Sequence, residues 1–214
     1  MEISTFELLV KRIAPPPAPP EIARRVVQGY FLTITNLESK DFTFRIRFFI
    51  SKPNPADPDR TLFGNVELFY DVAGANKPIT LLGGVNSNVF SGSFVLPAGQ
   101  TASVQLLPKP SLFFDPNNPN SNNPKLVNPD FEVRGYVSLR LPVLGPISNQ
   151  KPQSDTPVKV LINPEIRGTF LPNSFSNDSA EDFDQINYPL AIATGKALNE
   201  IAPDNPIDDI GPLA

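Results

Sequence analysis

Two acids on expected strands, Glu67 and Glu132, are the best candidates for carboxylate chemistry in this sequence. Both take outward positions in alternating runs, which would let them be neighbours on one sheet face. A glycoside hydrolase needs two such acids about 5 to 9 Å apart, usually with aromatic platforms for the sugar. The chain has no tryptophan, and four arginines share these faces: Arg45, Arg47, Arg134 and Arg140. Cross-strand ion pairs are therefore the preferred interpretation, and a carboxylate-dependent hydrolase is the alternative.

A second group of acids, near the carboxyl end, offers the oxygen ligands that a calcium ion takes. Its members are Asp178, Glu181, Asp182 and Asp184. The run lacks the alternation and the glycine of an EF-hand loop. Acids at a helix start, favoured by the helix dipole, explain it as well, so we expect neither a metal nor a cofactor.

Histidine and cysteine are both absent from the 214 residues. Without cysteine there is no disulfide, no thiolate nucleophile and no sulfur-bound metal. Without histidine the chain lacks the usual general base near neutral pH and the Ser/His/Asp triad. Only carboxylates, lysine, tyrosine and hydroxyls remain for catalysis, which favours a protein that is not an enzyme.

The net charge of −4 gives no general attraction to nucleic acid or anionic lipid. We therefore expect no nucleic-acid partner. The amino-terminal run MEISTFELLVKRIAPPP fits neither a signal peptide nor a membrane span. A cytoplasmic location is the resulting expectation.

Alternating apolar residues predict strands along most of the chain. In the clearest run, residues 42–51, one face carries Phe42, Phe44, Ile46, Phe48 and Ile50. Residues 30–35 predict the preceding strand, and the NLESKD turn between the two favours an antiparallel pair. Further strands are expected at 3–10, 61–72, 78–82, both arms of 89–108 around a tight PAGQ turn, 131–141, 158–162 and 166–171.

The chain is expected to have three regions. Residues 1–25 form an edge strand and a proline-rich arm, with Ala14–Pro20 as a polyproline II spacer and an SH3-type ligand as the alternative. Residues 26–171 form a β-sandwich domain, interrupted at 111–130 by a long loop rich in asparagine and proline.

Residues 172–214 form the third region, a short helix and an acidic tail. The helix is predicted from apolar residues at helical spacing, Leu190, Ala193, Ala197, Leu198 and Ile201. Pro203 follows and ends it.

Two stretches carry a resemblance to known proteins. TNLESKDFTFRIRFF and FVLPAGQTASVQL resemble the paired halves of bacterial immunoglobulin-like domains. Residues 167–175 and 182–201 resemble the carboxyl end of uncharacterised cyanobacterial proteins. The first resemblance implies an immunoglobulin-like fold, and neither assigns a role to any residue.

Five aromatic residues take positions opposite the inward sets: Phe31, Phe49, Phe63, Phe69 and Tyr136. Monomers rarely leave a large apolar patch bare, so something should cover this surface. The cover would be the amino-terminal arm, residues 78–82 or the carboxyl-terminal helix of the same chain, or else a neighbouring subunit. We therefore treat these five residues as the candidate interaction surface.

The sequence thus predicts an all-β fold, an immunoglobulin-like antiparallel β-sandwich with a short carboxyl-terminal helix and extended termini. Its expected function is that of a non-catalytic structural or protein-interaction module that associates with itself through its terminal extensions. A second copy or another protein is the expected partner. The alternative is a carbohydrate-binding module or a carboxylate-dependent glycoside hydrolase.

Overall fold

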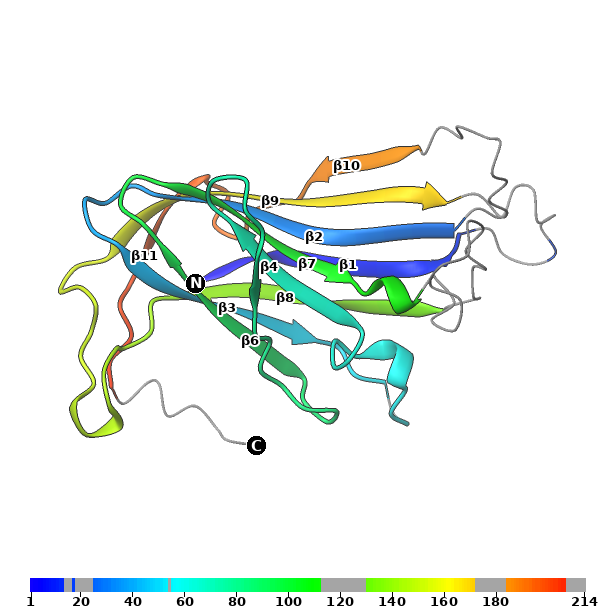
Figure 1. Ribbon diagram of the computed structural model, residues 1–214, viewed down its shortest axis with the longest axis horizontal. Coiled ribbons are helices and arrows are strands. Elements are labelled where there is room, and N and C mark those ends of the chain that lie inside the picture. The colour runs from blue at the N-terminus through cyan, green and yellow to red at the C-terminus, as the bar shows by residue number, and fades with distance from the viewer. Residues whose placement is uncertain (14–16, 18–24, 54, 113–129, 172–183, 207–214) are drawn as a thin grey trace.

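The computed structural model describes residues 1–13, 17, 25–53, 55–112, 130–171 and 184–206, and every structural statement below concerns these residues. They are predominantly β, and all paired strands run antiparallel (Figure 1). The strands are β1 Glu2–Arg12, β2 Arg25–Asn36, β3 Phe42–Ile50, β4 Val66–Asp71, β5 Lys77–Ile79, β6 Val89–Leu96, β7 Thr101–Pro108, β8 Phe131–Arg140, β9 Val158–Leu171, β10 Gln185–Pro189 and β11 Leu198–Ile201. Three short 3-10 helices are η1 Pro58–Arg60, η2 Pro110–Leu112 and η3 Ile147–Asn149.

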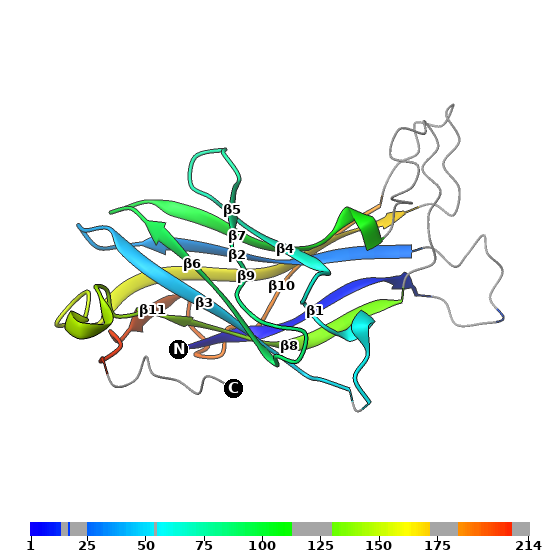
Figure 2. The ribbon, with the colours of Figure 1, turned by 60° about the horizontal axis from the view of Figure 1, so that its bottom comes forward.

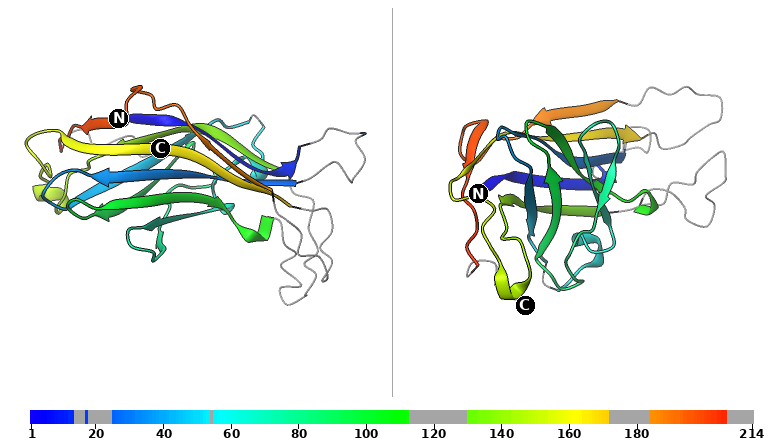
Figure 3. Two further views of the ribbon diagram at one scale, coloured as in Figure 1. Left: turned by 90° about the horizontal axis from the view of Figure 1, so that it is seen from above. Right: turned by 60° about the vertical axis from the view of Figure 1, so that its left-hand side comes forward.

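Strand β2 is where two sheets separate. One edge of β2 pairs with β9 along its whole length (Figure 3, left). The other edge is divided, because Arg25–Gln28 pair with β1 and Tyr30–Thr35 pair with β7. Gly29 lies between the two halves, where a Cβ would come within 2.7 Å of a Leu107 methyl carbon and 3.0 Å of the Leu106 carbonyl oxygen. A residue without a side chain is therefore required at the separation point.

The two sheets nearly close into a barrel. One continues from β2 through β1, β8 and β3 to β6, and the other through β7 and β4 to β5. On the side away from β2 they are joined by Leu82 and Ser91, which exchange backbone hydrogen bonds of 2.7 and 2.9 Å. Figure 2 shows β3 and β6 crossing the strands of the other sheet at an angle. The result is an almost closed barrel. On one side the two sheets share strand β2, and on the other side, in the described residues, they are joined by the single bridge between Leu82 and Ser91, which we call the weakly joined side.

The core confirms the predicted alternation. Strand β3 buries Phe42, Phe44, Ile46, Phe48 and Ile50 and leaves the residues between them half-buried. Rings from β1, β2 and β3 meet edge to face, with centroids 5.7 to 6.1 Å apart, in the cluster Phe6, Tyr30 and Phe48. Tyr30 lies on the half of β2 that pairs with β7, so its contacts with Phe6 and Phe48 connect the two sheets.

The antiparallel pairing expected between residues 30–35 and 42–51 is wrong. Strand β2 pairs with β1, β7 and β9, whereas β3 pairs with β6 and β8. The PAGQ turn likewise joins two strands, β6 and β7, that do not pair with each other. Each turn carries the chain from one sheet to the other, because the apolar faces of both strands must be buried in the same core.

The expected edge strand at residues 3–10 is an interior strand. Strand β1 pairs with β8 from Glu2 to Val10 and with β2 from Leu9 to Arg12. Its buried face, Phe6, Leu8 and Val10, is the one predicted. The proline spacer Ala14–Pro20 lies outside the described residues except for residue 17. Strand β1 itself belongs to the body of the fold.

Residues 158–162 and 166–171 form one strand rather than two. Strand β9 continues through Pro164, whose carbonyl oxygen accepts a hydrogen bond from the Leu190 N–H on the side away from β2. The nitrogen of Pro164 faces the same way, so the donor that proline lacks is missing from the outer edge of β9 and not from the β2 pairing. The interruption expected at Asn163 and Pro164, between residues 158–162 and 166–171, is therefore not needed.

The prediction of a carboxyl-terminal helix over residues 190–201 is wrong as well. Residues 185–189 and 198–201 are strands β10 and β11, which pair with successive parts of β9. Between them the chain runs along the open edge of β1, where the Ala193 N–H donates to the Ile3 carbonyl oxygen at 2.7 Å. Leu190 and Ile192 pack against the core. The apolar spacing taken for a helix thus belongs to a segment that covers the gap between β9 and β1.

Candidate interaction site

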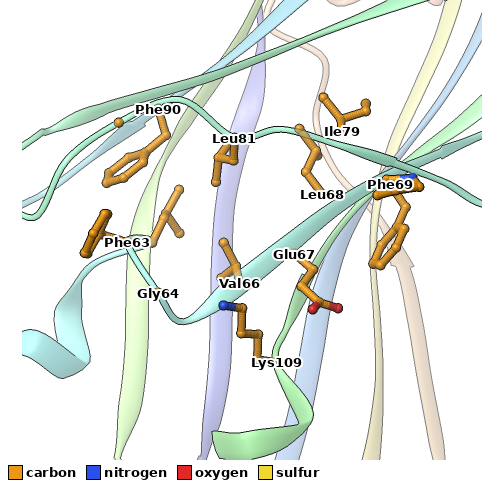
Figure 4. Close-up of a pocket in the computed structure, with 13 residues that line it drawn as sticks. Phe63, Gly64, Val66, Glu67, Leu68, Phe69, Ile79, Leu81, Phe90 and Lys109 are labelled. Carbon is orange, nitrogen blue, oxygen red and sulfur yellow. The ribbon is translucent and has the colours of Figure 1, made fainter.

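An apolar pocket opens where the barrel is weakly joined (Figure 4). It has a volume of about 410 Å³ and lies between β4, the segment after β5 and the start of β6. Its walls include the buried core residues Leu62, Val66, Leu68, Ile79 and Phe90. The pocket therefore gives access to the hydrophobic interior at a point where few backbone hydrogen bonds connect the sheets.

Two backbone features shape this pocket. At Gly83 (φ 154°) the chain passes directly over the Phe90 ring, and a Cβ there would lie 2.3 Å from a ring carbon. On the opposite side, the turn before β4 is held by Asn65, whose side-chain amide donates to the carbonyl oxygens of Pro58 and Thr61 at 2.8 and 3.0 Å. This turn fixes Phe63 at the mouth of the pocket.

Large apolar side chains are exposed at the pocket and on the segment that passes beside it. Phe63, in the lining, is 50% exposed. Leu82 and Val85 are 63% and 61% exposed, and they lie on the segment that supplies the lining residues Leu81 and Gly83. Glu67 and Lys109 are the charged residues among the lining. A hollow with exposed apolar residues and a few charges nearby is typical of a surface that binds another molecule.

The structure does not gather the five predicted aromatic residues onto one surface. Phe63 and Phe69 both line the pocket. Phe49 and Tyr136 lie on β3 and β8, where their rings stack in parallel with centroids 4.5 Å apart. Phe31 lies on β2 beneath the Arg167 guanidinium, whose central carbon is 4.6 Å from the ring centroid. Phe63 and Phe69 are thus the predicted residues that this pocket uses.

The sequence analysis missed the exposed residues Leu82 and Val85 on the segment beside the pocket. Both lie in TLLGGVNSN, where two leucines precede two glycines. Consecutive apolar residues next to chain-reversing glycines cannot all point into one core, and this is the signal that could have marked them as exposed.

Glu67 and Glu132 are not brought together. They lie on β4 and β8, strands that share no neighbour. Glu132 is 6% exposed and forms ion pairs with Lys11, Arg60 and Arg134. The hydrogen bond from Lys11, with further help from the nearby arginines, holds the pKa of Glu132 below its usual range although burial opposes this. A carboxylate so fully paired is poorly suited to accept or donate a proton.

A second groove, of about 500 Å³, has two tyrosines on its walls. Tyr136 on β8 and Tyr188 on β10 are both exposed, and between them lie Glu7 and Arg134, which form an ion pair. Burial and the charge of Glu7 raise the pKa of Tyr188, partly offset by a hydrogen bond with Gln28. Aromatic faces beside charged hydrogen-bonding groups suit a ligand with both apolar and polar faces.

Metal ligands and membrane spans were also sought in the described part of the chain. It contains no group of three or more acidic side chains arranged to hold a metal ion. Of the four acids considered for calcium, only Asp184 is described. None of the described helices has the length and apolar character needed to cross a membrane.

Comparisons with known proteins add no family to this description. No protein-family model, no curated protein and no solved structure matches the chain.

Proposed function

We propose that this chain is a non-catalytic structural or protein-interaction module that associates with copies of itself. The observation that carries the proposal is the pocket at the weakly joined side of the barrel, with Phe63 exposed in its lining and Leu82 and Val85 exposed on the segment that supplies Leu81 and Gly83 to it. Burying these exposed side chains against another protein removes apolar surface from water, which is the main driving force of association.

The surface proposed for association differs from the terminal extensions expected from the sequence. Strand β1 pairs with β8 along most of one edge and with β2 over Leu9–Arg12 of the other, so its transfer to another copy would break both ladders. Residues 14–16, 18–24 and 207–214 lie outside the described part of the chain. The exposed side chains of Phe63, Leu82 and Val85 need no such rearrangement and offer the simpler contact.

Light scattering coupled to size-exclusion chromatography tests the proposal over a series of protein concentrations. The wild type should show a mass above that of one chain that rises with concentration. Replacing Phe63 and Leu82 by serine together should shift this equilibrium toward the monomer at least tenfold. Leu198→Ser on β11, which removes an equally exposed apolar side chain away from the pocket, should leave it unchanged. A wild type that stays monomeric at every concentration would contradict self-association.

A shortened chain is a poor test of the same idea. A chain that starts at Glu21 lacks β1, an interior strand whose side chains Phe6, Leu8 and Val10 are buried in the core. Its failure to associate would report the loss of the fold rather than the loss of a contact.

A carbohydrate-binding module is the second candidate, favoured by the groove between Tyr136 and Tyr188. Sugar rings stack on exposed aromatic faces, and Glu7 and Arg134 supply hydrogen-bonding groups for hydroxyls. Screening against a panel of glycans, with Tyr136→Ala and Tyr188→Ala as variants, tests it. Phe63→Ala removes an exposed ring outside this groove and is the control. Loss of glycan binding in the two tyrosine variants alone would support this second candidate.

Three further interpretations remain predictions. The division of the fold into two facing sheets is compatible with the immunoglobulin-like resemblance, and a solved structure with matching strand order would be needed to establish it. A hydrolase that uses Glu67 and Glu132 would require these two acids to approach each other. The cytoplasmic location rests on the sequence alone.

A further inference from the structure

The outer edge of β6 is only partly paired. In the ladder between β6 and β3, the Ile50 N–H donates to the Asn88 carbonyl oxygen, so the even-numbered residues of β6 point their backbone groups toward β3. The odd-numbered residues point outward. Of these, Ser91 is bonded to Leu82, whereas the backbone groups of Ser93 and Val95 meet no other strand of the described residues.

The features that usually protect an edge are missing here. The sequence of β6, VFSGSFVL, contains no charged residue and no proline. Its pairing with β3 runs without a bulge from Val89 to Leu96. The side chain of Val95 is 47% exposed. An uncharged, regular and partly apolar edge readily accepts another strand.

The open part of the edge begins next to Gly92. A Cβ at this position would lie 2.6 and 2.7 Å from methyl carbons of Leu68 and Ile79, so glycine lets β4 and β5 pack closely against β6 here. Beyond Gly92, no strand of the other sheet pairs with Ser93 or Val95. The edge is therefore open only over its last few residues, which limits how a partner strand can align.

We propose that β6 of a second copy of this chain pairs antiparallel with this edge, with the two strands related by a two-fold axis at Phe94. This inference rests on the proposed self-association and names its contact. With Ser93 opposite Val95 of the other copy, each outward N–H and C=O of these residues finds a partner, which makes four hydrogen bonds. Other alignments place these groups opposite Ser91, already bonded to Leu82, or opposite Pro97, which has no N–H.

The symmetry of this alignment favours a second copy over an unrelated peptide. One short, uncharged sequence supplies both strands, and no charge on either strand opposes the approach. The new pair would make β3 and β6 of the two copies one continuous sheet. The exposed residue Leu82 bridges Ser91 on the same edge and would be near the contact.

Cysteine cross-linking tests the alignment, because the native chain contains no cysteine. Directly opposed residues in such a pair have Cα atoms about 5.5 Å apart, within the range that a disulfide bridges. A mixture of the Ser93→Cys and Val95→Cys variants should therefore form a disulfide-linked dimer under mild oxidation. Each variant alone should form at least tenfold less, because its own cysteines are not opposite each other.

Light scattering on edge variants completes the test. Val95→Lys places a charge at the edge and should raise the dimer dissociation constant at least tenfold, whereas Leu198→Lys, on β11, should not change it. Circular dichroism checks that both variants stay folded. If the wild type and Val95→Lys associate equally and the mixed cysteine variants do not cross-link, this inference is wrong, while the proposed self-association stands. If the wild type is monomeric throughout, both are wrong.

Discussion

Ala193 donates its backbone N–H to the carbonyl oxygen of Ile3 at 2.7 Å, so a late segment of the chain completes the edge of its first strand. Three residues earlier, the Leu190 N–H donates to the Pro164 carbonyl oxygen on β9 at 2.9 Å. These two bonds connect β9 and β1 at a place where the strands themselves do not pair. The segment between them is therefore part of the barrel wall.

We expect the apolar side chains of this segment to stabilise the fold. Leu190→Ala and Ile192→Ala should each lower the free energy of unfolding by about 1 to 2 kcal/mol, less than for fully buried residues because both are only partly covered. Leu198→Ala, which truncates an exposed side chain, should change it by less than about 0.5 kcal/mol. Denaturant titration measures all three. Equal effects in the three variants would mean that the segment is not part of the wall.

Alternation was enough to predict most strands but not their partners. In β3, residues two apart face the same way whatever the neighbouring strand is, so its buried set could be predicted locally. In β8 the predicted apolar set is buried, but Glu132 and Ser138, which alternation places outward, are buried as well. Partners depend on which apolar faces meet across the core, as Phe6, Tyr30 and Phe48 do. A short polar turn such as NLESKD is compatible both with a hairpin and with a change of sheet.

The prediction of a helix between Leu190 and Ile201 was wrong for a related reason. Apolar residues three or four apart also occur where an irregular segment fits into a gap, and Gly195, at φ 71°, makes a turn that no helix contains. At the candidate site, the strand predicted at 61–72 placed Phe63 outward, and Phe63 is exposed, but it lies in the turn before β4, which begins at Val66. The pocket itself was not predictable, because it depends on the way the two sheets diverge beyond the Leu82 and Ser91 bridge.

The buried carboxylate of Glu132 should matter for stability in acid. Its pKa is lowered in the folded protein, mainly by the hydrogen bond from Lys11, so its contribution is present above the unfolded pKa and is lost as the pH falls through the folded pKa. We expect the unfolding free energy of the wild type to fall as the pH drops below about 5, and that of Glu132→Gln to fall less.

At neutral pH, Glu132→Gln should lower the unfolding free energy by about 1 to 3 kcal/mol, because three cations lose their charged partner but remain partly exposed. Glu67→Gln, at an exposed position, is the control and should change it by less than about 0.5 kcal/mol. Identical pH profiles for the wild type and Glu132→Gln would contradict this role.

Gly135 should tolerate no side chain. It lies opposite Ile50 in the pairing of β8 with β3, and a Cβ there would come within 1.8 Å of the Phe49 carbonyl oxygen. Because the clash is with backbone, Gly135→Ala should cost about 3 kcal/mol or more, enough to lower the yield of folded protein. Gly84→Ala is the matched control, since the nearest atom to a Cβ there is the Ser87 hydroxyl oxygen at 3.8 Å. Thermal melting of both variants distinguishes these outcomes.

Tyr30 should not ionise while the protein is folded. Its ring is buried between β1 and β3, its hydroxyl lies 3.3 Å from that of Ser4, and burial raises the pKa of its phenol well above 10. Ultraviolet titration should therefore show a smaller ionisation signal near pH 10 in the native wild type than after unfolding. Because the unfolded state ionises first, the stability that depends on the neutral phenol is present below the unfolded pKa and is lost as the pH rises above it. Tyr30→Phe should remove this alkaline loss, and its native and unfolded ionisation signals should differ less than those of the wild type. Equal native and unfolded signals in the wild type would place Tyr30 in contact with water.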